Sequence, residues 1–246
     1  MNRLTTRTLA ACAVVACAAL APLSQVNAAS VNGYYVTLSS AHPDVQNGID
    51  GGVTPGLVQA ALGPNGLPVV STPAYGGPSG PITDVNPVTG ELLWWTPGRG
   101  IVQFEKVQVD PVPFSFTSNF FPDGQGSNAA AFRAVRWQGA FSLAAPKSVT
   151  FTLAADDDAW LFINSQLFVD DGGVKGLTTH SNTAVFAAGN YTIDLFFADR
   201  HQVQSGVSFT SSEELTSVIP VPGALPLLAS GLLMFGLGAR RRIARC

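Results

Sequence analysis

The stretch from Asp156 to Gly173 reads DDDAWLFINSQLFVDDGG, and it predicts the central unit of the fold. Two short apolar runs flank Asn164 and Ser165, a pair typical of a two-residue turn, so the stretch is predicted to form a β-hairpin. The two ends of a hairpin lie side by side. We therefore expect the acids before the first strand and those after the second strand to form one patch.

Carboxylates crowd the open end of this predicted hairpin. They are Asp156, Asp157, Asp158, Asp170 and Asp171. Like charges held close together repel each other unless a cation lies between them. Because calcium prefers oxygen ligands, the sequence predicts a Ca²⁺ site at this end of the hairpin. The alternative is that these acids are solvated loop residues at strand ends.

Short segments of alternating polar and apolar residues continue on both sides of the hairpin, with turn residues between them and no convincing helical period. This pattern predicts an all-β fold, an antiparallel β-sandwich or jelly roll with long Gly/Pro-rich loops. In the strand expected over 191–197, alternate residues such as Ile193 and Leu195 would face the core and Asp194 would face outward. The expected strands cover residues 34–38, 102–109, 114–116, 132–143, 148–153, 160–163, 167–169, 183–186, 191–197 and 206–211.

Residues 30–100 are rich in Gly, Pro and Asn, and they predict a region dominated by loops. Residues 56–62 are expected to form a short helix or a turn. The paired Trp94 and Trp95 would supply apolar contacts that tether the region to the sandwich. Such a pair argues against the alternative of a disordered linker.

The first 28 residues have the features of a secretory signal peptide. Arg3 and Arg7 form a basic head, an apolar run follows, and a small-residue cleavage pattern ends at Ala28. Cleavage is therefore predicted after Ala28. Cys17 leaves open the alternative of processing as a bacterial lipoprotein.

The C-terminal segment is apolar and ends in basic residues. Residues 218–239 carry no charge, and Arg240, Arg241 and Arg242 follow directly. A helix of that length would span about 33 Å, close to the thickness of a bilayer core, and the arginines favour a cytoplasmic end. Pro220 and Pro222 weaken the start of such a helix. A transient membrane segment is expected, with a permanent C-terminal anchor as the alternative.

The order of Pro220, Pro222, an apolar helix and a terminal arginine cluster resembles the PEP-CTERM sorting signal of Gram-negative bacteria. The resemblance implies processing near the two prolines by an exosortase and release to the cell surface or into exopolysaccharide. Val221 departs from the pattern, because the family most often has Glu there. The expected organisation is a signal peptide over 1–28, a β domain over 29–217 and a sorting segment over 218–246.

Charge and cysteine content narrow the function classes. All three cysteines lie in the terminal segments, so the β domain would contain neither a disulfide nor thiol chemistry. Six of the 13 basic residues also lie in these segments, which leaves 7 basic and 16 acidic residues between them, a net charge of −9. Because phosphate binding depends on clustered Lys and Arg, this balance disfavours a nucleic-acid partner.

Several blocks within residues 35–212 resemble, in order, the fibro-slime domain, an extracellular module related to the sugar-binding domain of anthrax protective antigen. Two positions depart from the family pattern: Ser165 stands where the turn usually has Gly, and Lys175 stands where His is usual. The matching blocks are residues 42–44, 56–58, 66–69, 120–124, 156–164, 167–173 and 196–201.

In the related sugar-binding domains, two adjacent aspartates joined by a cis peptide bond hold Ca²⁺, and the ion contacts sugar hydroxyls. The resemblance assigns this role to Asp156 and Asp157. With the hairpin acids and one acid from a neighbouring strand, the predicted metal set is Asp156, Asp157, Asp158, Asp170, Asp171 and Asp199. The predicted ligand-binding set is Asp156, Asp157, Asn164, Arg200 and His201.

These observations predict an exported protein of the cell surface or exopolysaccharide matrix of a Gram-negative bacterium. It would bind a glycan or exopolysaccharide through Ca²⁺. One alternative is a structural matrix protein in which the metal only stabilises a loop. A polysaccharide-active enzyme is a weaker alternative, because three adjacent acids on one loop are poorly placed to flank a glycosidic bond from both sides. No common nucleophile, zinc-protease or phosphate-loop motif is present, and no enzyme activity is expected.

Overall fold

The computed structural model describes residues 28–46, 53–71 and 82–217 of the chain, and this part is all-β, as the sequence predicts. The processing residues Pro220, Pro222, Arg240, Arg241 and Arg242 lie outside the described residues, and Ala28 lies exposed at their N-terminal limit. The described part contains no helix long and apolar enough to cross a membrane.

Thirteen strands make up the described fold. They are β1 (Ser30–Ser39), β2 (Val58–Leu62), β3 (Pro68–Val70), β4 (Val102–Pro111), β5 (Phe114–Phe116), β6 (Ala131–Leu143), β7 (Lys147–Asp156), β8 (Asp158–Ile163), β9 (Gln166–Asp171), β10 (Thr178–Phe186), β11 (Gly189–Ala198), β12 (Gly206–Ser211) and β13 (Thr216–Ser217).

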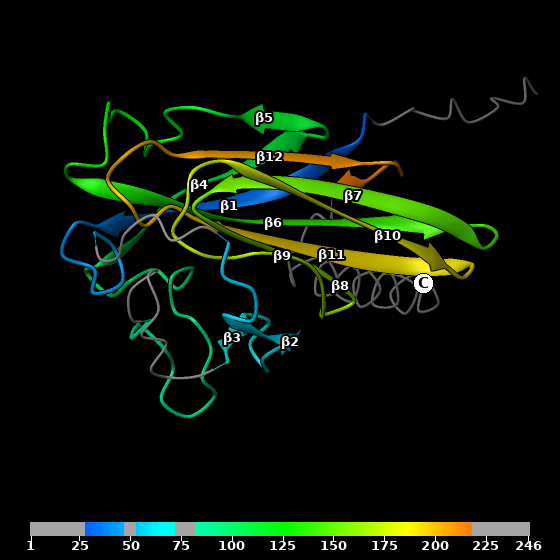
Figure 1. The fold of residues 1–246 in the computed structure, drawn as a ribbon, viewed down its shortest axis with the longest axis horizontal. Coiled ribbons are helices and arrows are strands. Elements are labelled where there is room, and N and C mark those ends of the chain that lie inside the picture. Colours follow the sequence, from blue (N-terminus) through cyan, green and yellow to red (C-terminus); the bar gives the residue numbers. More distant parts are fainter. Residues whose placement is uncertain (1–27, 47–52, 72–81, 218–246) are drawn as a thin grey trace, which may run out of the picture.

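The strands form two antiparallel sheets that pack as layers (Figure 1). The larger sheet has the order β3-β2-β9-β8-β11-β6-β1-β4, with β13 paired to β6. The smaller sheet has the order β10-β7-β12-β5. One hydrophobic core fills the space between the layers and includes Trp137, Phe151, Leu161 and Phe209. The predicted β-sandwich is confirmed.

A second hydrophobic core covers the outer face of the larger sheet. It contains Trp94 and Trp95 from the Gly/Pro-rich region, packed with Trp160 and Phe196 of the sheet. Trp94 and Trp95 therefore supply the tethering contacts expected of them. The helix or turn expected over residues 56–62 is wrong, because residues 58–62 form β2 and pair with β3 and β9.

Because the larger sheet is covered on both sides, β11 is buried on both faces. Ile193 and Leu195 point into the core between the sheets, as predicted, while Phe196 packs in the second core. Asp194 lies on that second face but is only 8% exposed, and Arg136 donates hydrogen bonds to it. The expectation that Asp194 simply faces water is therefore wrong.

The predicted hairpin is confirmed as β8 and β9. Asn164 and Ser165 form its turn with φ angles of 48° and 64°, the positive values that a tight two-residue hairpin turn requires. Trp160 pairs with Asp170 and Ala159 pairs with Asp171. The hairpin thereby brings its acidic ends together.

Candidate cation and ligand site

The acidic end of the hairpin lies where strands of both sheets meet. Asp156 ends β7 and pairs with Gly206 of β12, whereas Asp158 begins β8 and pairs with Ala198 of β11. The peptide bond between Asp156 and Asp157 is cis, as the resemblance implied. The chain thus passes from the smaller sheet to the larger one through the three consecutive aspartates.

Asp158 forms a buried ion pair with Arg200. Nε of Arg200 donates to Oδ2 of Asp158 at 2.6 Å, and both side chains are 0% exposed. The backbone N–H of Gly173 donates to the other oxygen, Oδ1, at 2.6 Å. The Arg200 guanidinium lies over the ring of Trp94, 5.2 Å from its centroid. A cation from the protein itself therefore neutralises Asp158.

Asp171 is paired with Lys175 in the loop after β9. Nζ of Lys175 lies 3.2 Å from Oδ1 of Asp171 and donates to the backbone oxygens of Ala155 and Asp157 at 2.7 Å and 2.6 Å. The Lys175 side chain is only 1% exposed. Burial raises the pKa of Asp171 to about 7, although the ammonium of Lys175 opposes the shift. Lys175 thus places a buried ammonium group against Asp171 and the backbone oxygens of Ala155 and Asp157.

Asp170 binds N–H groups on the face of the hairpin that packs against the second core. Its Oδ2 accepts from the N–H of Gly56 at 2.7 Å, and its Oδ1 accepts from Nε1 of Trp160 at 3.0 Å and from the N–H of Gly172 at 3.3 Å. These bonds connect the hairpin to the segment before β2. The structure therefore does not bring Asp170 together with Asp156 and Asp157.

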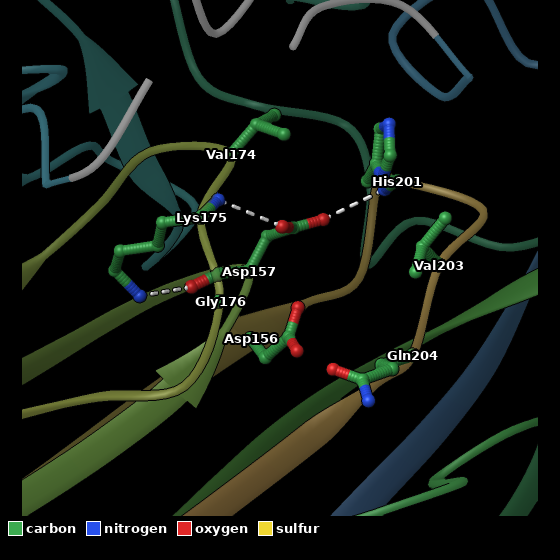
Figure 2. A pocket seen from close by; sticks show the side chains of 8 residues that line it. All are labelled: Asp156, Asp157, Val174, Lys175, Gly176, His201, Val203 and Gln204. Atoms are coloured by element: carbon green, nitrogen blue, oxygen red, sulfur yellow. Dashed lines mark hydrogen bonds between the residues drawn. The ribbon is translucent and has the colours of Figure 1, made fainter. Parts of the chain in front are cut away.

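Asp157 is held by backbone groups from two loops. Its Oδ1 accepts from the N–H of Lys175 at 3.0 Å, and its Oδ2 accepts from the N–H groups of Arg200 and His201 at 2.8 Å and 2.7 Å. Burial, and next the charge of Asp158, raise its pKa. Figure 2 shows this carboxylate lying between Lys175 and His201. Its position is thus set independently of any side-chain cation.

Asp199 differs from Asp158 and Asp171 because no cation among the described residues pairs with it. It is buried, and neither of its oxygens accepts a hydrogen bond of good geometry from the described residues. Burial, and next the charge of Asp157, hold its pKa well above its usual value, although the nearby polar groups of Ser205 and Asn128 oppose the shift. The charge of Asp156 raises it further. Asp199, Asp157 and Asp156 therefore form a group of mutually repelling charges.

Asn128 brings an additional unused oxygen. Its Nδ2 donates to the backbone oxygens of His201 and Gln204 at 2.9 Å and 3.0 Å, which fixes the amide, while its buried Oδ1 accepts no hydrogen bond from the described residues. The sequence analysis missed Asn128. It lies in a stretch of Gly, Ser and Asn whose composition indicates only a loop.

A pocket of about 170 Å³ opens above Asp156 and Asp157. Its remaining lining comes from the loops after β9 and β11, as Figure 2 shows: Val174, Lys175, Gly176, His201, Val203 and Gln204. Pockets for drug-sized ligands usually measure ~300–1,000 Å³. The space therefore suits an ion and the edge of a small polar ligand.

Asn164 and Arg200 lie away from this pocket, although both were predicted to contact the ligand. Asn164 is in the turn at the opposite end of β8, where its Oδ1 accepts from the N–H of Thr192 at 2.9 Å. Arg200 is fully buried against Asp158. The structure thus brings together three residues of the predicted ligand-binding set, Asp156, Asp157 and His201.

Among the described residues, no three His, Cys, Asp or Glu side chains are gathered in a way that would by themselves hold a metal ion. Of the six predicted metal ligands, Asp158 and Asp171 are paired with cations of the chain, and Asp170 binds N–H donors. The charges of Asp157 and Asp156 act on the third of the other predicted ligands, Asp199. A metal here would need further oxygen ligands, and Oδ1 of Asn128 is an unused amide oxygen of a side chain close to Asp199.

One protein-family model matches part of the chain. Residues 123–221 match the PA14 domain, a range that contains Asp156, Asp157, Asp199 and Asn128. Trp94 and Trp95 of the second core lie outside this match.

Two proteins of Dictyostelium discoideum are similar over most of this chain. Protein psiQ is 29% identical over 209 residues, which cover 74% of this chain and 21% of psiQ. Protein psiR is 27% identical over 208 residues, which cover 72% of this chain and 20% of psiR. The chain spans about a fifth of the length of these curated relatives.

Similar solved structures include two PA14 domains. The PA14 sugar-binding domain from an RTX adhesin is 13% identical with a TM-score of 0.33, and the match covers 77% of this chain and 96% of that one. The PA14 domain of the MpAFP antifreeze protein is 10% identical with a TM-score of 0.37, and the match covers 78% and 83% of the two chains.

Proposed function

We propose that this protein is an exported carbohydrate-binding module that holds Ca²⁺ at Asp156, Asp157 and Asp199, with Asn128 as a further ligand. The observation that carries the proposal is the Asp199 carboxylate. It is buried near two other acids, and among the described residues no cation pairs with it and no well-formed hydrogen bond reaches it. Leaving a buried charge unpaired is costly, so such a group indicates a missing cation. The PA14 match over the same residues supports this interpretation.

The donor chemistry fits calcium. Among the described residues, the buried atoms of the site that lack a hydrogen bond are the carboxylate oxygens of Asp199 and the amide oxygen of Asn128, and hard cations prefer oxygen ligands. When bound, Ca²⁺ supplies positive charge and open coordination positions that sugar hydroxyls can occupy. Smaller Mg²⁺ is less suitable, since it keeps most of its water and demands a rigid octahedral site.

The chain's own residues would orient the ligand around that charge. The backbone N–H groups of Lys175, Arg200 and His201 already hold the Asp157 carboxylate in place. Binding would therefore cost little conformational entropy at this side chain. Gln204 and His201 line the pocket with polar groups, and Val203 offers an exposed apolar surface beside them. A sugar is complementary to such a lining, because its hydroxyls can bind the polar groups and its C–H face can pack on the apolar surface.

The first test is thermal unfolding with excess Ca²⁺ and with a chelator. A ligand at about 100 times its Kd stabilises the folded state by ~2.7 kcal/mol, so the melting temperature of the parent should rise clearly with Ca²⁺. Asp199→Asn should abolish the rise. Asp170→Asn is the matched control, because Asp170 is a neighbouring acid that binds backbone N–H and Trp160, and this variant should keep the rise. No response to Ca²⁺ in the parent would refute the metal site.

The second test is binding to a glycan array and to bacterial exopolysaccharide. Binding that disappears with the chelator and in Asp199→Asn supports the module proposed here. A clear calcium response without any carbohydrate affinity would instead support a structural matrix protein. Hydrolysis of a polysaccharide that is lost with Asp156→Asn would favour the enzyme alternative. We propose no enzymatic activity, because the described residues that line the pocket include no acid across from Asp156 and Asp157.

The cellular setting is also a proposal. The signal-peptide features of residues 1–28 and the PEP-CTERM-like residues 218–246 favour export, a transient membrane segment and processing by an exosortase. The fibro-slime resemblance and the PA14 match accord with an extracellular place. Fractionation of the producing cells with mass spectrometry of the mature termini tests both processing sites.

A further inference from the structure

Strand β4 is the free edge of the larger sheet. It pairs with β1 on one side and is the last strand in the sheet order (labelled β4 in Figure 1). Beyond the β1 ladder, the backbone of residues 103–111 makes no hydrogen bond to another described segment. An edge strand presents unpaired N–H and C=O groups that can bind another strand, unless the protein protects it.

The exposed face of β4 is apolar. Phe104, Val107 and Val109 are 52%, 61% and 58% exposed. They pair with Val36, Tyr34 and Asn32 of β1, which alternate along that strand, so the three side chains point to the same face of the sheet. Three of the seven large hydrophobic residues that stand exposed in the described chain are therefore gathered on this one edge strand.

A β-bulge at Glu105 explains how Phe104 and Val107 come to share a face. Tyr35 pairs with Lys106 and Val36 pairs with Phe104, so Glu105 is the extra residue. Its carboxylate binds Arg133, and Lys106 binds Asp123, on the opposite face. The bulge thereby sorts the strand into an apolar face and a charged face.

The sequence of β4 is self-complementary when read in both directions. Residues 102–109 are VQFEKVQV, and two copies running antiparallel with Glu105 opposite Lys106 place complementary residue types opposite each other throughout. The resulting cross-strand pairs are Gln103 with Gln108, Phe104 with Val107 and Glu105 with Lys106. Val102 would lie opposite Val109, but it is buried and its backbone oxygen accepts from the N–H of Gly98, so the ladder ends at Gln103. Such apolar and opposite-charge pairs stabilise an antiparallel ladder.

The antiparallel pairing of two β4 strands with Glu105 opposite Lys106 is possible only because β4 contains the bulge at Glu105. Directly opposed residues point to the same face of a sheet, and a two-fold axis perpendicular to the sheet keeps each residue on its face. Phe104 can therefore face Val107 of a second copy only if both lie on one face of β4. The bulge between them satisfies that condition.

From the self-complementary register and the exposed apolar face, we propose that β4 pairs with β4 of a second copy of this chain. The pairing forms a two-fold symmetric dimer and joins the two larger sheets into one. Each protomer contributes the same patch, as expected for an isologous interface. The candidate cation site takes no part in this contact, so the dimer stands apart from the proposed carbohydrate function.

Sedimentation velocity of the purified protein over a wide concentration range tests the dimer. The parent should dimerise, and Val107→Lys should weaken association by about tenfold or more because it places a charge opposite Phe104. The matched control is Val185→Lys on β10, the edge strand of the smaller sheet, where Val185 is 75% exposed. That variant should leave association unchanged. A monomeric parent at every concentration would overturn the proposal.

Mixing charged variants tests the register itself. Phe104→Lys and Val107→Glu should each weaken association alone. An equal mixture should form heterodimers, because the lysine introduced at position 104 then faces the glutamate introduced at position 107 of the other copy. A mixture of Phe104→Lys and Val109→Glu should not regain dimer formation, since position 109 faces position 102 of the other copy. Equal recovery in both mixtures would refute this register. All three positions are exposed, so the variants should keep the fold, which circular dichroism verifies.

Discussion

The acids at the open end of the β8–β9 hairpin fall into two groups that differ in their surroundings. Asp158 and Asp171 lie against Arg200 and Lys175, and these cations come from the same chain. Asp199 is buried to the same extent, yet no cation of the described chain pairs with it and neither of its oxygens accepts a well-formed hydrogen bond there. The first group is complete in the sense that each acid has a cation of the folded chain beside it. The second is incomplete, because burial and neighbouring acids make ionisation of Asp199 unfavourable and an external cation would relieve that cost.

The comparison also explains why the hairpin can fold with so many acids. Two protein cations neutralise the acids nearest the strands, and backbone N–H groups hold Asp157. The fold is thus expected to form before any metal binds. Calcium would then add stability and ligand affinity to a site that is already shaped.

The largest effect should follow from breaking the complete group at Arg200. Arg200→Met leaves the Asp158 charge buried without its partner, and removal of one member of a buried pair typically costs about 3–5 kcal/mol. The free energy of unfolding in urea measures the loss. The double variant Arg200→Met with Asp158→Asn should recover part of it. A loss of less than about 1 kcal/mol in the single variant would mean that the pair contributes little.

Removing the second internal cation should have a smaller effect. Lys175→Met deprives Asp171 and the backbone oxygens of Ala155 and Asp157 of their donor, which costs about 1–3 kcal/mol for buried groups left unsatisfied. Asp171 limits the loss because its raised pKa allows it to take up a proton. The same urea titration gives the value. Lys175→Arg serves as the control that retains the charge, and equal losses in both variants would point to packing instead of charge.

Substitution in the incomplete group should raise the stability of the metal-free protein, whereas substitution in the complete group lowers it. Asp199→Asn removes a buried carboxyl group that has no cation beside it among the described residues. In a chelator, at a pH high enough to ionise Asp199 despite its raised pKa, this variant should be more stable than the parent by about 1 kcal/mol. In excess Ca²⁺ the order should reverse, because only the parent gains from the ion. Paired melting curves under the two conditions provide the measurement. A variant less stable than the parent even in chelator would contradict the account of Asp199 as an uncompensated charge.

The smallest effect is a pH dependence within the complete group. Burial raises the pKa of Asp171 to about 7, so the folded state binds this proton more tightly than the unfolded state does. The resulting stability is fully present below the unfolded pKa of ~4 and is lost as the pH rises through about 7. In chelator, the melting temperature should therefore decline from about pH 5 to about pH 8. Asp171→Asn should make this decline shallower, and an unchanged slope would exclude Asp171 as its source.

Local sequence determined much of this architecture. Alternation of apolar and polar residues predicted the all-β sandwich, since that period reports which face of a strand is buried. The pair Asn164 and Ser165 predicted the hairpin turn, where both residues adopt positive φ angles. The hairpin in turn paired Ala159, which follows the three aspartates, with Asp171. These features depend on neighbours in the chain, so they can be read from it directly.

The tertiary structure alone decided which of the clustered acids lacks a cation. Arg200 and Asn128 reach the hairpin from loops distant in the sequence. Only their packing assigns a cation to Asp158 and, among the described residues, none to Asp199. It also formed the second core that buries Asp194, and it introduced the bulge at Glu105 that gives β4 an apolar face. The physical reason is the same in each case. Charge pairing, burial and register are properties of contacts between distant segments, and composition or periodicity within one segment does not specify those contacts.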